Sequence, residues 1–299
     1  MSRLSPHPRR RLGVVLLWGL VTGMLGACVP SGPGGDSSQF SERARSVATA
    51  WRRSGALAAW RDGFVVLGEL TQVTGFDDRD DLKNGFMLGV MGLGTAVPNT
   101  TGSGTVTFPD GSTRAVALVG ARTAYEALVP HRVDSCPPAA DRCAALVVTA
   151  AELGTTTLLT NRGQATVPAW RFSVAGMSQP ILRVAVAPAE LVTPPAPDVG
   201  GSTMAVGVGA GSLLGVSGNE IRYQLLIGAC DTEPRGLLHE ESDIVVVGGV
   251  VTPPQGNYAC TANIVATPVT VRTTAPVGAR PIVDVMTGQA VVPSRFPTG

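Results

Sequence analysis

Histidine, the residue best suited to acid–base and metal chemistry near neutral pH, occurs only three times in this chain of 299 residues. His7 precedes an apolar N-terminal run typical of a cleaved signal peptide and would be removed with it. A Ser-His-Asp site would therefore have to use His131 or His239. His239 begins the sequence HEESD, which starts like a zinc-protease helix but lacks the second histidine. We therefore expect residues 239–243 to form an exposed acidic turn between strands, without a bound metal.

Carboxylates are the other candidates for chemistry. Four of them lie within five residues: Asp77, Asp78, Asp80 and Asp81. Calcium takes about six to eight oxygen ligands, but the D-x-D-x-D-G spacing of a calcium loop is absent, so a solvated loop is the favoured interpretation. A glycan hydrolase would need two paired carboxylates, yet no spacing selects a pair among Glu69, Asp110, Glu126 and Glu152. We name no catalytic residue and expect no metal or cofactor.

Cys28 lies in a context that predicts its covalent modification. It ends the motif Leu25-Gly26-Ala27-Cys28, which follows three consecutive arginines and the apolar residues 12–25. Fourteen residues span about 21 Å as a helix, less than the roughly 30 Å of a bilayer core, so a cleaved signal peptide fits better than a transmembrane helix. The motif resembles the lipobox of bacterial lipoproteins, whose cysteine sulfur receives a diacylglycerol. An ordinary secretory signal that carries a cysteine is the alternative, and twin-arginine export is a weaker possibility.

Acylation at Cys28 would make the lipid bilayer the first partner of this protein. Residues 1–27 would then be the lipoprotein signal peptide, and residues 28–38 a tether rich in Gly, Pro and Ser. Two or three acyl chains anchor durably, because each buried CH₂ contributes about 0.8 kcal/mol. The expected location is the cell membrane, on its extracytoplasmic face.

The charge balance of the chain argues against nucleic acid as a partner. Residues 1–27 hold four arginines and no acidic residue, so the chain from Cys28 onward has 19 basic and 22 acidic residues, a net charge of −3. Proteins that bind nucleic acid present a basic surface to the phosphates, and this composition provides none.

The cysteines support an exported protein. With Cys28 acylated, four remain, which allow three pairings. Proximity in the chain favours Cys136 with Cys143 and Cys230 with Cys260. A four-cysteine metal site is the alternative, but the six and twenty-nine residues between these cysteines do not match the spacing of two to four in zinc knuckles.

A helix is expected at the start of the mature chain, followed by strands. Residues 39–61 carry apolar residues on one helical stripe, which we interpret as a packing face: Phe40, Ala44, Val47, Trp51 and Ala58. Gly55 is expected to break the helix into two pieces. Residues 64–72 read as a strand, and the Asp110-Gly111 pair predicts a hairpin between residues 104–108 and 113–119.

Further strands follow. Residues 145–153 and 155–161 read as two strands separated by Gly154, and residues 165–174 alternate with a period of two. Pro168 cannot donate to a ladder, so the strand that contains it is expected at a sheet edge or at a bulge. Its edge could recruit a partner by strand addition. The glycine-rich residues 207–218 are expected to form a flexible loop.

The chain is expected to be mainly β and sandwich-like, with a short N-terminal helix, and a division into two β subdomains is one interpretation. The proline-rich residues 188–201 divide a helix-plus-β region, 39–187, from a β-sandwich-like region, 202–299. In the second region Ile221, Tyr223, Leu225 and Ile227 alternate toward one face, while residues 245–247 form a fully apolar run. The alternative is one β domain in which residues 188–201 are a long crossover.

Three stretches resemble a group of uncharacterised secreted lipoproteins of actinobacteria. They are residues 51–70, the block 143–172 with its VPAWRF sequence, and RPIVDVMTG at residues 280–288. The resemblance implies a location at the cell surface and no defined activity, and it assigns no functional residue.

These observations leave three hypotheses about function. The leading one is a membrane-anchored protein that binds an envelope protein or scaffolds the envelope. The sequence does not decide whether the protein is an enzyme, and the lack of a recognisable reaction centre argues against it. An envelope hydrolase would require His131 or His239 next to carboxylates in a pocket. A carrier of small ligands would require a closed apolar cavity.

Overall fold

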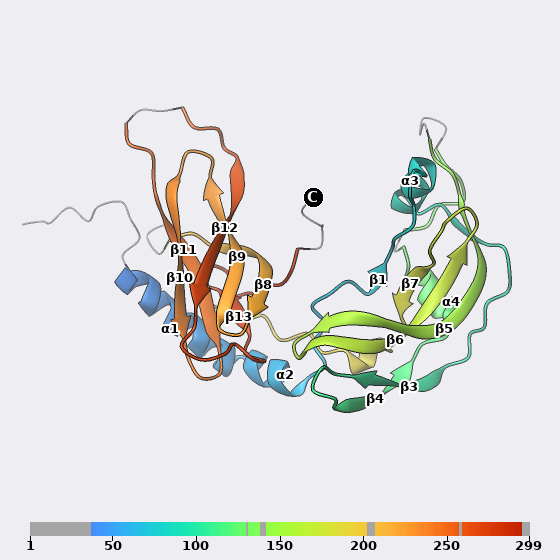
Figure 1. Cartoon of the computed structure of the whole chain (residues 1–299), viewed down its shortest axis with the longest axis horizontal. Coiled ribbons are helices and arrows are strands. Elements are labelled where there is room, and N and C mark those ends of the chain that lie inside the picture. Colours follow the sequence, from blue (N-terminus) through green and yellow to red (C-terminus); the bar gives the residue numbers. More distant parts are fainter. Residues whose placement is uncertain (1–36, 130, 138–141, 202–206, 257–258, 295–299) are drawn as a thin grey trace, which may run out of the picture. The chain divides into compact units, whose positions relative to one another are not determined.

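The protein is built mainly from β-strands, as expected from the sequence. A computed structural model describes residues 37–129, 131–137, 142–201, 207–256 and 259–294, with strands at 41% and helices at 17%. Three sheets and a short N-terminal helical segment give a β-sandwich-like fold with subdomains (Figure 1). Cys28 and the rest of the predicted leader lie outside the described residues.

The first sheet has seven strands. Its main path runs β1-β7-β6-β3-β4, and β5 pairs with both β6 and β2. The strands are β1 (Thr71–Gln72), β2 (Met91–Leu93), β3 (Gly102–Thr107), β4 (Thr113–Leu118), β5 (Leu146–Thr160), β6 (Gly163–Val174) and β7 (Ile181–Val184). The hairpin at Asp110-Gly111 joins β3 to β4 as predicted, and Gly111 adopts the positive φ of 79° that such turns require.

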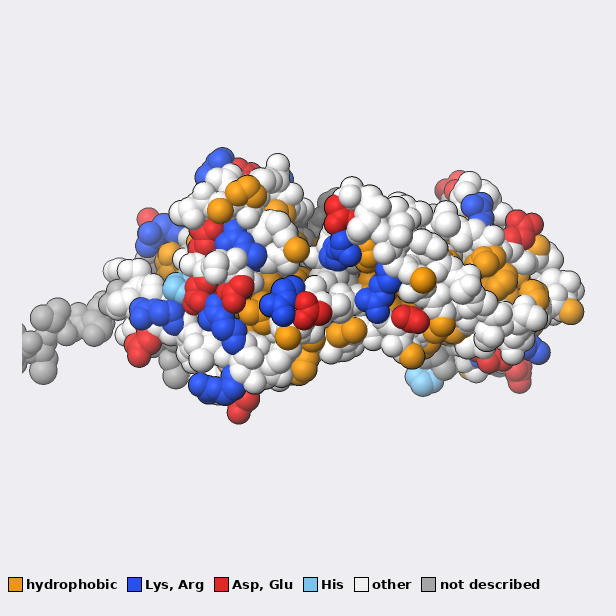
Figure 2. Space-filling model, turned by 90° about the horizontal axis from the view of Figure 1, so that it is seen from below, with side chains coloured by type: hydrophobic (Ala, Val, Ile, Leu, Met, Phe, Trp, Pro, Cys, Tyr) orange, Lys and Arg blue, Asp and Glu red, His pale blue; other side chains and the backbone are white. Residues whose placement is uncertain are grey.

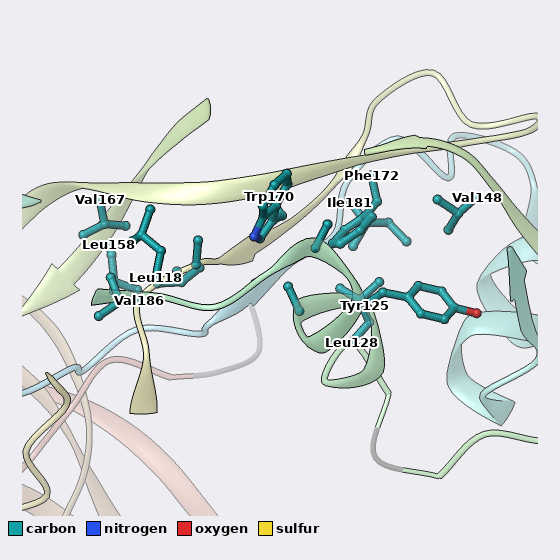
Figure 3. Packing of buried hydrophobic residues seen from close by; sticks show 14 of the residues in the cluster. Leu118, Tyr125, Leu128, Val148, Leu158, Val167, Trp170, Phe172, Ile181 and Val186 are labelled. Carbon is teal, nitrogen blue, oxygen red and sulfur yellow. The ribbon is translucent and has the colours of Figure 1, made fainter. Parts of the chain in front are cut away.

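The core of this sheet is covered by a short helix, α4 (Ala121–Glu126). Tyr125 packs edge-on against Phe172 of β6, with ring centroids 6.2 Å apart. Figure 3 shows Tyr125 and Leu128 beneath Phe172 and Ile181, while Trp170 lies further along β6. The alternation predicted for residues 165–174 thus places Trp170 and Phe172 in the core.

Two three-stranded sheets form the C-terminal part. One contains β10 (Thr232–Glu240), β11 (Val245–Thr252) and β13 (Ile282–Asp284), and the other β8 (Ala210–Ser217), β9 (Glu220–Gly228) and β12 (Ile264–Arg272). Ile221, Tyr223 and Leu225 of β9 are fully buried, as their alternation predicts. β11 is buried on both faces, which explains its uninterrupted run of valines.

The N-terminal helical segment is divided at Gly55, which has a φ of 81°. It comprises α1 (Ser37–Arg53) and α2 (Ala56–Asp62). The predicted stripe is buried along α1, but Ala58 is exposed, because the break at Gly55 changes the phase and buries Ala56 and Trp60 instead.

The packing partners of α1 lie far away in the sequence. Phe40, Val47 and Trp51 share a core cluster with Val246 of β11 and Val283 of β13. The sequence grouped this helix with the strands up to residue 187, whereas its apolar face covers C-terminal strands. The division of the chain into domains stays a prediction.

Three local expectations about strands were wrong. Only Thr71–Gln72 of residues 64–72 is a strand. Gly154 does not interrupt β5, because it pairs with Ala169 in a regular ladder, where Arg171 packs against it. Most of the glycine-rich stretch 207–218 forms strand β8 instead of a flexible loop.

Pro168 lies inside the sheet and not at an edge or a bulge. β6 pairs with β5 along its length, and its pairing with β5 is regular at Thr155–Pro168. On the other side, β6 pairs with β3 at Thr166 and with β7 from Ala169 onward. Pro168 lies between the part of β6 that pairs with β3 and the part that pairs with β7. No neighbouring strand needs an N–H from residue 168, so the proline removes no hydrogen bond of the sheet. The idea that a partner strand adds near Pro168 is therefore wrong.

Residues 188–201 are less loosely packed than their prolines predict. They start with a 3₁₀ turn, η1 (Pro188–Glu190). Arg43 of α1 then holds the segment, since its guanidinium donates to the carbonyls of Val199 and Gly200. The same guanidinium also donates to the carbonyl of Val285.

Both predicted disulfides are present. Cys136 is bonded to Cys143, and Cys230 to Cys260. The first closes a short loop before β5, and the second links the loop after β9 to the segment before β12. Their presence removes the alternative of a four-cysteine metal site.

Candidate functional site

The most highly charged group of contacts surrounds the hairpin turn between β10 and β11. We call Glu240, Glu241, Ser242 and Asp243 the acidic turn. The N–H of Glu241 donates to the carbonyl of Ile244 at 3.0 Å, which closes a tight connection between two adjacent antiparallel strands. Residues at such a turn project in different directions, because side chains alternate along a strand. The acidic turn therefore meets two different cations.

The first cation is Arg52 from the C-terminal end of α1. Its Nε donates to Asp243 Oδ2 at 3.0 Å, and its second nitrogen bonds both Asp243 and Glu241. The hydrogen bond from Arg52 lowers the pKa of Asp243 and, in return, that bond raises the pKa of Arg52. For Glu241, burial opposes ionisation, but hydrogen bonds from Arg52 and His239 outweigh it and lower the pKa.

The second cation is Arg280, in the loop between β12 and β13. It pairs with Glu240 at 2.9 Å, and both side chains are largely shielded, with 12% and 15% of their surface exposed. Its remaining donors bond backbone carbonyls, among them those of Glu241, Ala275 and Pro276. Arg280 thus connects the acidic turn to the loop of residues 273–280.

Glu240 is bound from a second side by Thr274. Its Oε2 accepts the Thr274 N–H at 2.6 Å and the Thr274 hydroxyl at 2.8 Å. The backbone bond to Thr274 and the pair with Arg280 lower the pKa of Glu240 to about 2. Glu240 is therefore ionised near neutral pH and cannot serve there as a general acid.

An open depression of about 510 Å³ lies beside these pairs. Its lining consists of Glu240, Glu241, Ser242, Thr274, Ala275, Pro276, Val277 and Arg280. Basic and acidic side chains are interspersed on the face of the molecule shown in Figure 2. Because the depression is open and three of its eight lining residues are charged, it differs from the closed apolar cavity that a small-ligand carrier would require.

His239 is the one candidate histidine that the structure places next to a carboxylate. Its Nε2 lies 3.1 Å from Glu241 Oε1, and the side chain is 21% exposed. Ser242 lines the neighbouring depression, but within the described structure it forms no hydrogen bond with His239. His131 is exposed and lies between α4 and β5, apart from this site.

The aspartate cluster is divided between an exposed turn, which holds Asp77 and Asp78 as the solvated-loop interpretation predicts, and the start of a helix. Asp80 and Asp81 lie in the first turn of α3 (Asp80–Leu88), where negative charge is favourable. Asp81 pairs with Arg79 at 2.8 Å, and this hydrogen bond lowers the pKa of Asp81 to about 2. In the described part of the chain, no three metal-binding side chains come together.

The four carboxylates considered for glycan hydrolysis lie on different elements. Asp110 is in the β3–β4 turn, where it bonds Ser112 and Arg162. Glu126 ends α4, Glu152 lies within β5, and Glu69 precedes β1. The structure therefore selects no catalytic pair among them.

Sequence reasoning expected an exposed acidic turn at residues 239–243, but His239 and Glu240 end strand β10 and are half-buried. It also missed both cations that bind the turn. Arg52 lies outside the apolar stripe predicted for this helix, and its partner Asp243 lies 191 residues further along the chain. Arg280 is an isolated arginine in a loop, 40 residues from Glu240. No local pattern marks such pairs, because tertiary packing alone brings them together.

Comparisons with known proteins found no matching family model, no matching curated protein and no matching solved structure. None of the described helices combines the length and apolar character needed to cross a membrane.

Proposed function

We propose that this protein is a lipoprotein anchored through Cys28 to the extracytoplasmic face of the cell membrane, where it binds a component of the envelope. The motif Leu25-Gly26-Ala27-Cys28, at the end of a short apolar run, carries the proposal. The similarity to secreted lipoproteins of actinobacteria agrees with it. Two disulfides in the folded part suit an oxidising compartment.

The contacts of the acidic turn favour binding over catalysis. Arg280 directs its donors to Glu240 and to backbone carbonyls, and Asp243 is occupied by Arg52. Groups that are bonded to the fold in this way stabilise it and have little capacity to exchange protons with a substrate. The site is therefore proposed to present a fixed charged surface to a partner.

The anchor is tested by replacing Cys28 with serine in the full chain. We expect the wild-type protein to incorporate radiolabelled palmitate and to partition into detergent, and Cys28→Ser to do neither. Cys136 and Cys143 form a disulfide, so a Cys136→Ser/Cys143→Ser variant that keeps its label is the matched control. Equal labelling of wild type and Cys28→Ser would refute the anchor.

The binding role is tested by crosslinking at the surface of cells that express the full chain. The wild type should capture a defined envelope partner, and a double charge reversal, Glu241→Arg with Asp243→Arg, should reduce its recovery. Arg45→Glu, on the exposed face of α1, is the control for a change of surface charge. Recovery of background proteins alone would count against a binding role.

A hydrolase is the second candidate, and the pair of His239 with Glu241 favours it. This pair lies beside the depression, so a histidine base oriented by a carboxylate is available there. Hydrolysis of a cell-wall preparation by the purified chain should then be lost in His239→Gln. An activity that is equal in wild type and His239→Gln would eliminate this candidate.

A further inference from the structure

Strand β12 is an edge strand of its sheet within the described structure, where the order is β12-β9-β8; β10 of the other sheet lies near it but forms no backbone ladder with it. Ile264 is 73% exposed and Val265 43% exposed, although both are large apolar residues. Residues 264–271 read IVATPVTV, in which six of eight residues are β-branched and none is charged. Uncharged, β-branched segments at an open sheet edge favour pairing with another chain.

Two hydrogen bonds show which residues of β12 direct their backbone N–H and carbonyl groups toward this edge. The N–H of Thr273 donates to Asn219 at 2.9 Å, and the carbonyl of Asn263 accepts from Ala229 at 3.1 Å. Both bonds belong to the same unbroken register between β12 and β9. In an antiparallel ladder, each residue directs its N–H and its carbonyl to the same side of the strand, and successive residues alternate between the two sides. Odd-numbered residues of β12 therefore bond to β9, and even-numbered residues point to the open edge.

Pro268 occupies the central one of the five positions that point outward: Ile264, Ala266, Pro268, Thr270 and Arg272. It pairs with Gln224 in the regular register and is itself exposed. At an odd-numbered position a proline would remove a bond to β9. At position 268 it removes only a donor that faces solvent, which is where sheets tolerate proline.

We infer that Pro268 prevents β12 from pairing with β12 of a second copy of this protein. The edge is otherwise compatible with itself: antiparallel pairing centred on residue 268 places Ala266 opposite Thr270 and Ile264 opposite Arg272, with no like charges opposed. In that register the two prolines face each other where two N–H donors are needed. The missing donors and the pyrrolidine rings interrupt the ladder at its centre.

Substitution at position 268 in the full chain, purified in detergent, tests this inference. Pro268→Thr restores the N–H and should raise the mass measured by light scattering about twofold or more above wild type. Pro268→Lys restores the same N–H but adds a charge at the edge, so it should keep the wild-type mass. Pro254→Thr, at an exposed loop proline, is the matched control and should behave as wild type.

Hydrogen exchange identifies the contact surface. In associated Pro268→Thr, the amides of Ala266 and Thr270 should exchange more slowly than in wild type, while circular dichroism stays unchanged. A wild-type mass for Pro268→Thr would overturn the inference. Association without protection of these two amides would also overturn it, as would equal association of Pro268→Lys.

Discussion

The guanidinium of Arg280 connects its own loop, residues 275–280, to Glu240 and Glu241, which lie about 40 residues earlier in the chain. Its pair with Glu240 is mostly shielded from solvent, and charge-assisted bonds of this kind contribute about 1.5–3 kcal/mol. We expect Arg280→Gln to lower the free energy of unfolding by about 1–3 kcal/mol, as measured by urea denaturation. The loss arises because Glu240 and several carbonyls lose their shared donor.

Arg122 provides the control for this prediction. It pairs with Glu126 one helical turn away at 3.8 Å, and both side chains are about half exposed. Exposed pairs of this type contribute about 0.3–0.5 kcal/mol, so Arg122→Gln should change stability little. Equal losses in the free energy of unfolding for Arg122→Gln and Arg280→Gln would contradict the stabilising role assigned to Arg280.

The depressed pKa of Glu240 predicts how stability depends on pH. Its pKa falls from the ordinary 4.5 to about 2 in the folded protein. Ionised Glu240 therefore stabilises the fold fully above about pH 4.5, and this contribution fades as the pH falls toward 2. Between about pH 5 and 2.5, Glu240→Gln should lose less stability than the wild type. Parallel pH profiles of unfolding for the two proteins would argue against this assignment.

The charged contacts show which features of the site could be predicted from the sequence and which could not. The acidic turn was recognisable because Glu240, Glu241 and Asp243 are neighbours in the chain. Arg52 lies outside the predicted apolar stripe of its helix, and nothing nearby in the sequence indicates that it binds Asp243. Contacts between segments some 190 residues apart depend on how α1 packs onto β11, which the local pattern does not encode.

At the scale of elements, Gly55 determines where the N-terminal helix ends. Its φ of 81° is unfavourable for residues with a side chain, although a Cβ there would meet no atom within 4 Å. Gly55→Ala should therefore lower the melting temperature through backbone strain of about 1–2 kcal/mol. Gly92 also has open space around its Cβ position but no positive φ, so Gly92→Ala should be nearly neutral. Identical melting shifts would show that strain at residue 55 is negligible.

Strands were predictable where burial of one face produces an alternating pattern in the sequence. They were not predictable where the conformation depends on the adjacent strands in the sheet. The alternation in β9 and the Asp110-Gly111 hairpin were read correctly, because local rules determine them. Pro168 and Gly154 were misread, since each is accommodated by adjacent strands: the exchange of β3 for β7 beside Pro168, and the side chain of Arg171 over Gly154. The turn-like composition of residues 207–218 likewise gave no sign that β9 would pair with them.

The two disulfides should contribute unequally to stability. The chain-entropy model assigns about 3–4 kcal/mol to the Cys230–Cys260 loop, with a separation of 30, and about 2–3 kcal/mol to Cys136–Cys143, with a separation of 7. We expect the Cys230→Ser/Cys260→Ser variant to unfold at a lower urea concentration than the Cys136→Ser/Cys143→Ser variant. The reverse order would show that loop length does not govern their effects.

At the scale of the whole molecule, the N-terminal motif carries the proposal of a lipid anchor. Helix α1 begins at Ser37, nine residues after Cys28, and its apolar face packs onto β11 and β13. If Cys28 carries the proposed lipid, the start of α1 at Ser37 lies within about 32 Å of the modified sulfur, the reach of nine extended residues. The acidic turn is bonded to the C-terminal end of α1 through Arg52.

Mass spectrometry of the N-terminal peptide of the mature protein tests the central claim most directly. The account predicts that the chain begins at Cys28 and that this peptide carries the added mass of a diacylglycerol thioether, with or without an N-acyl chain. A mature protein that retains residues 1–27, or one whose Cys28 is cleaved off or free of lipid, would contradict the account.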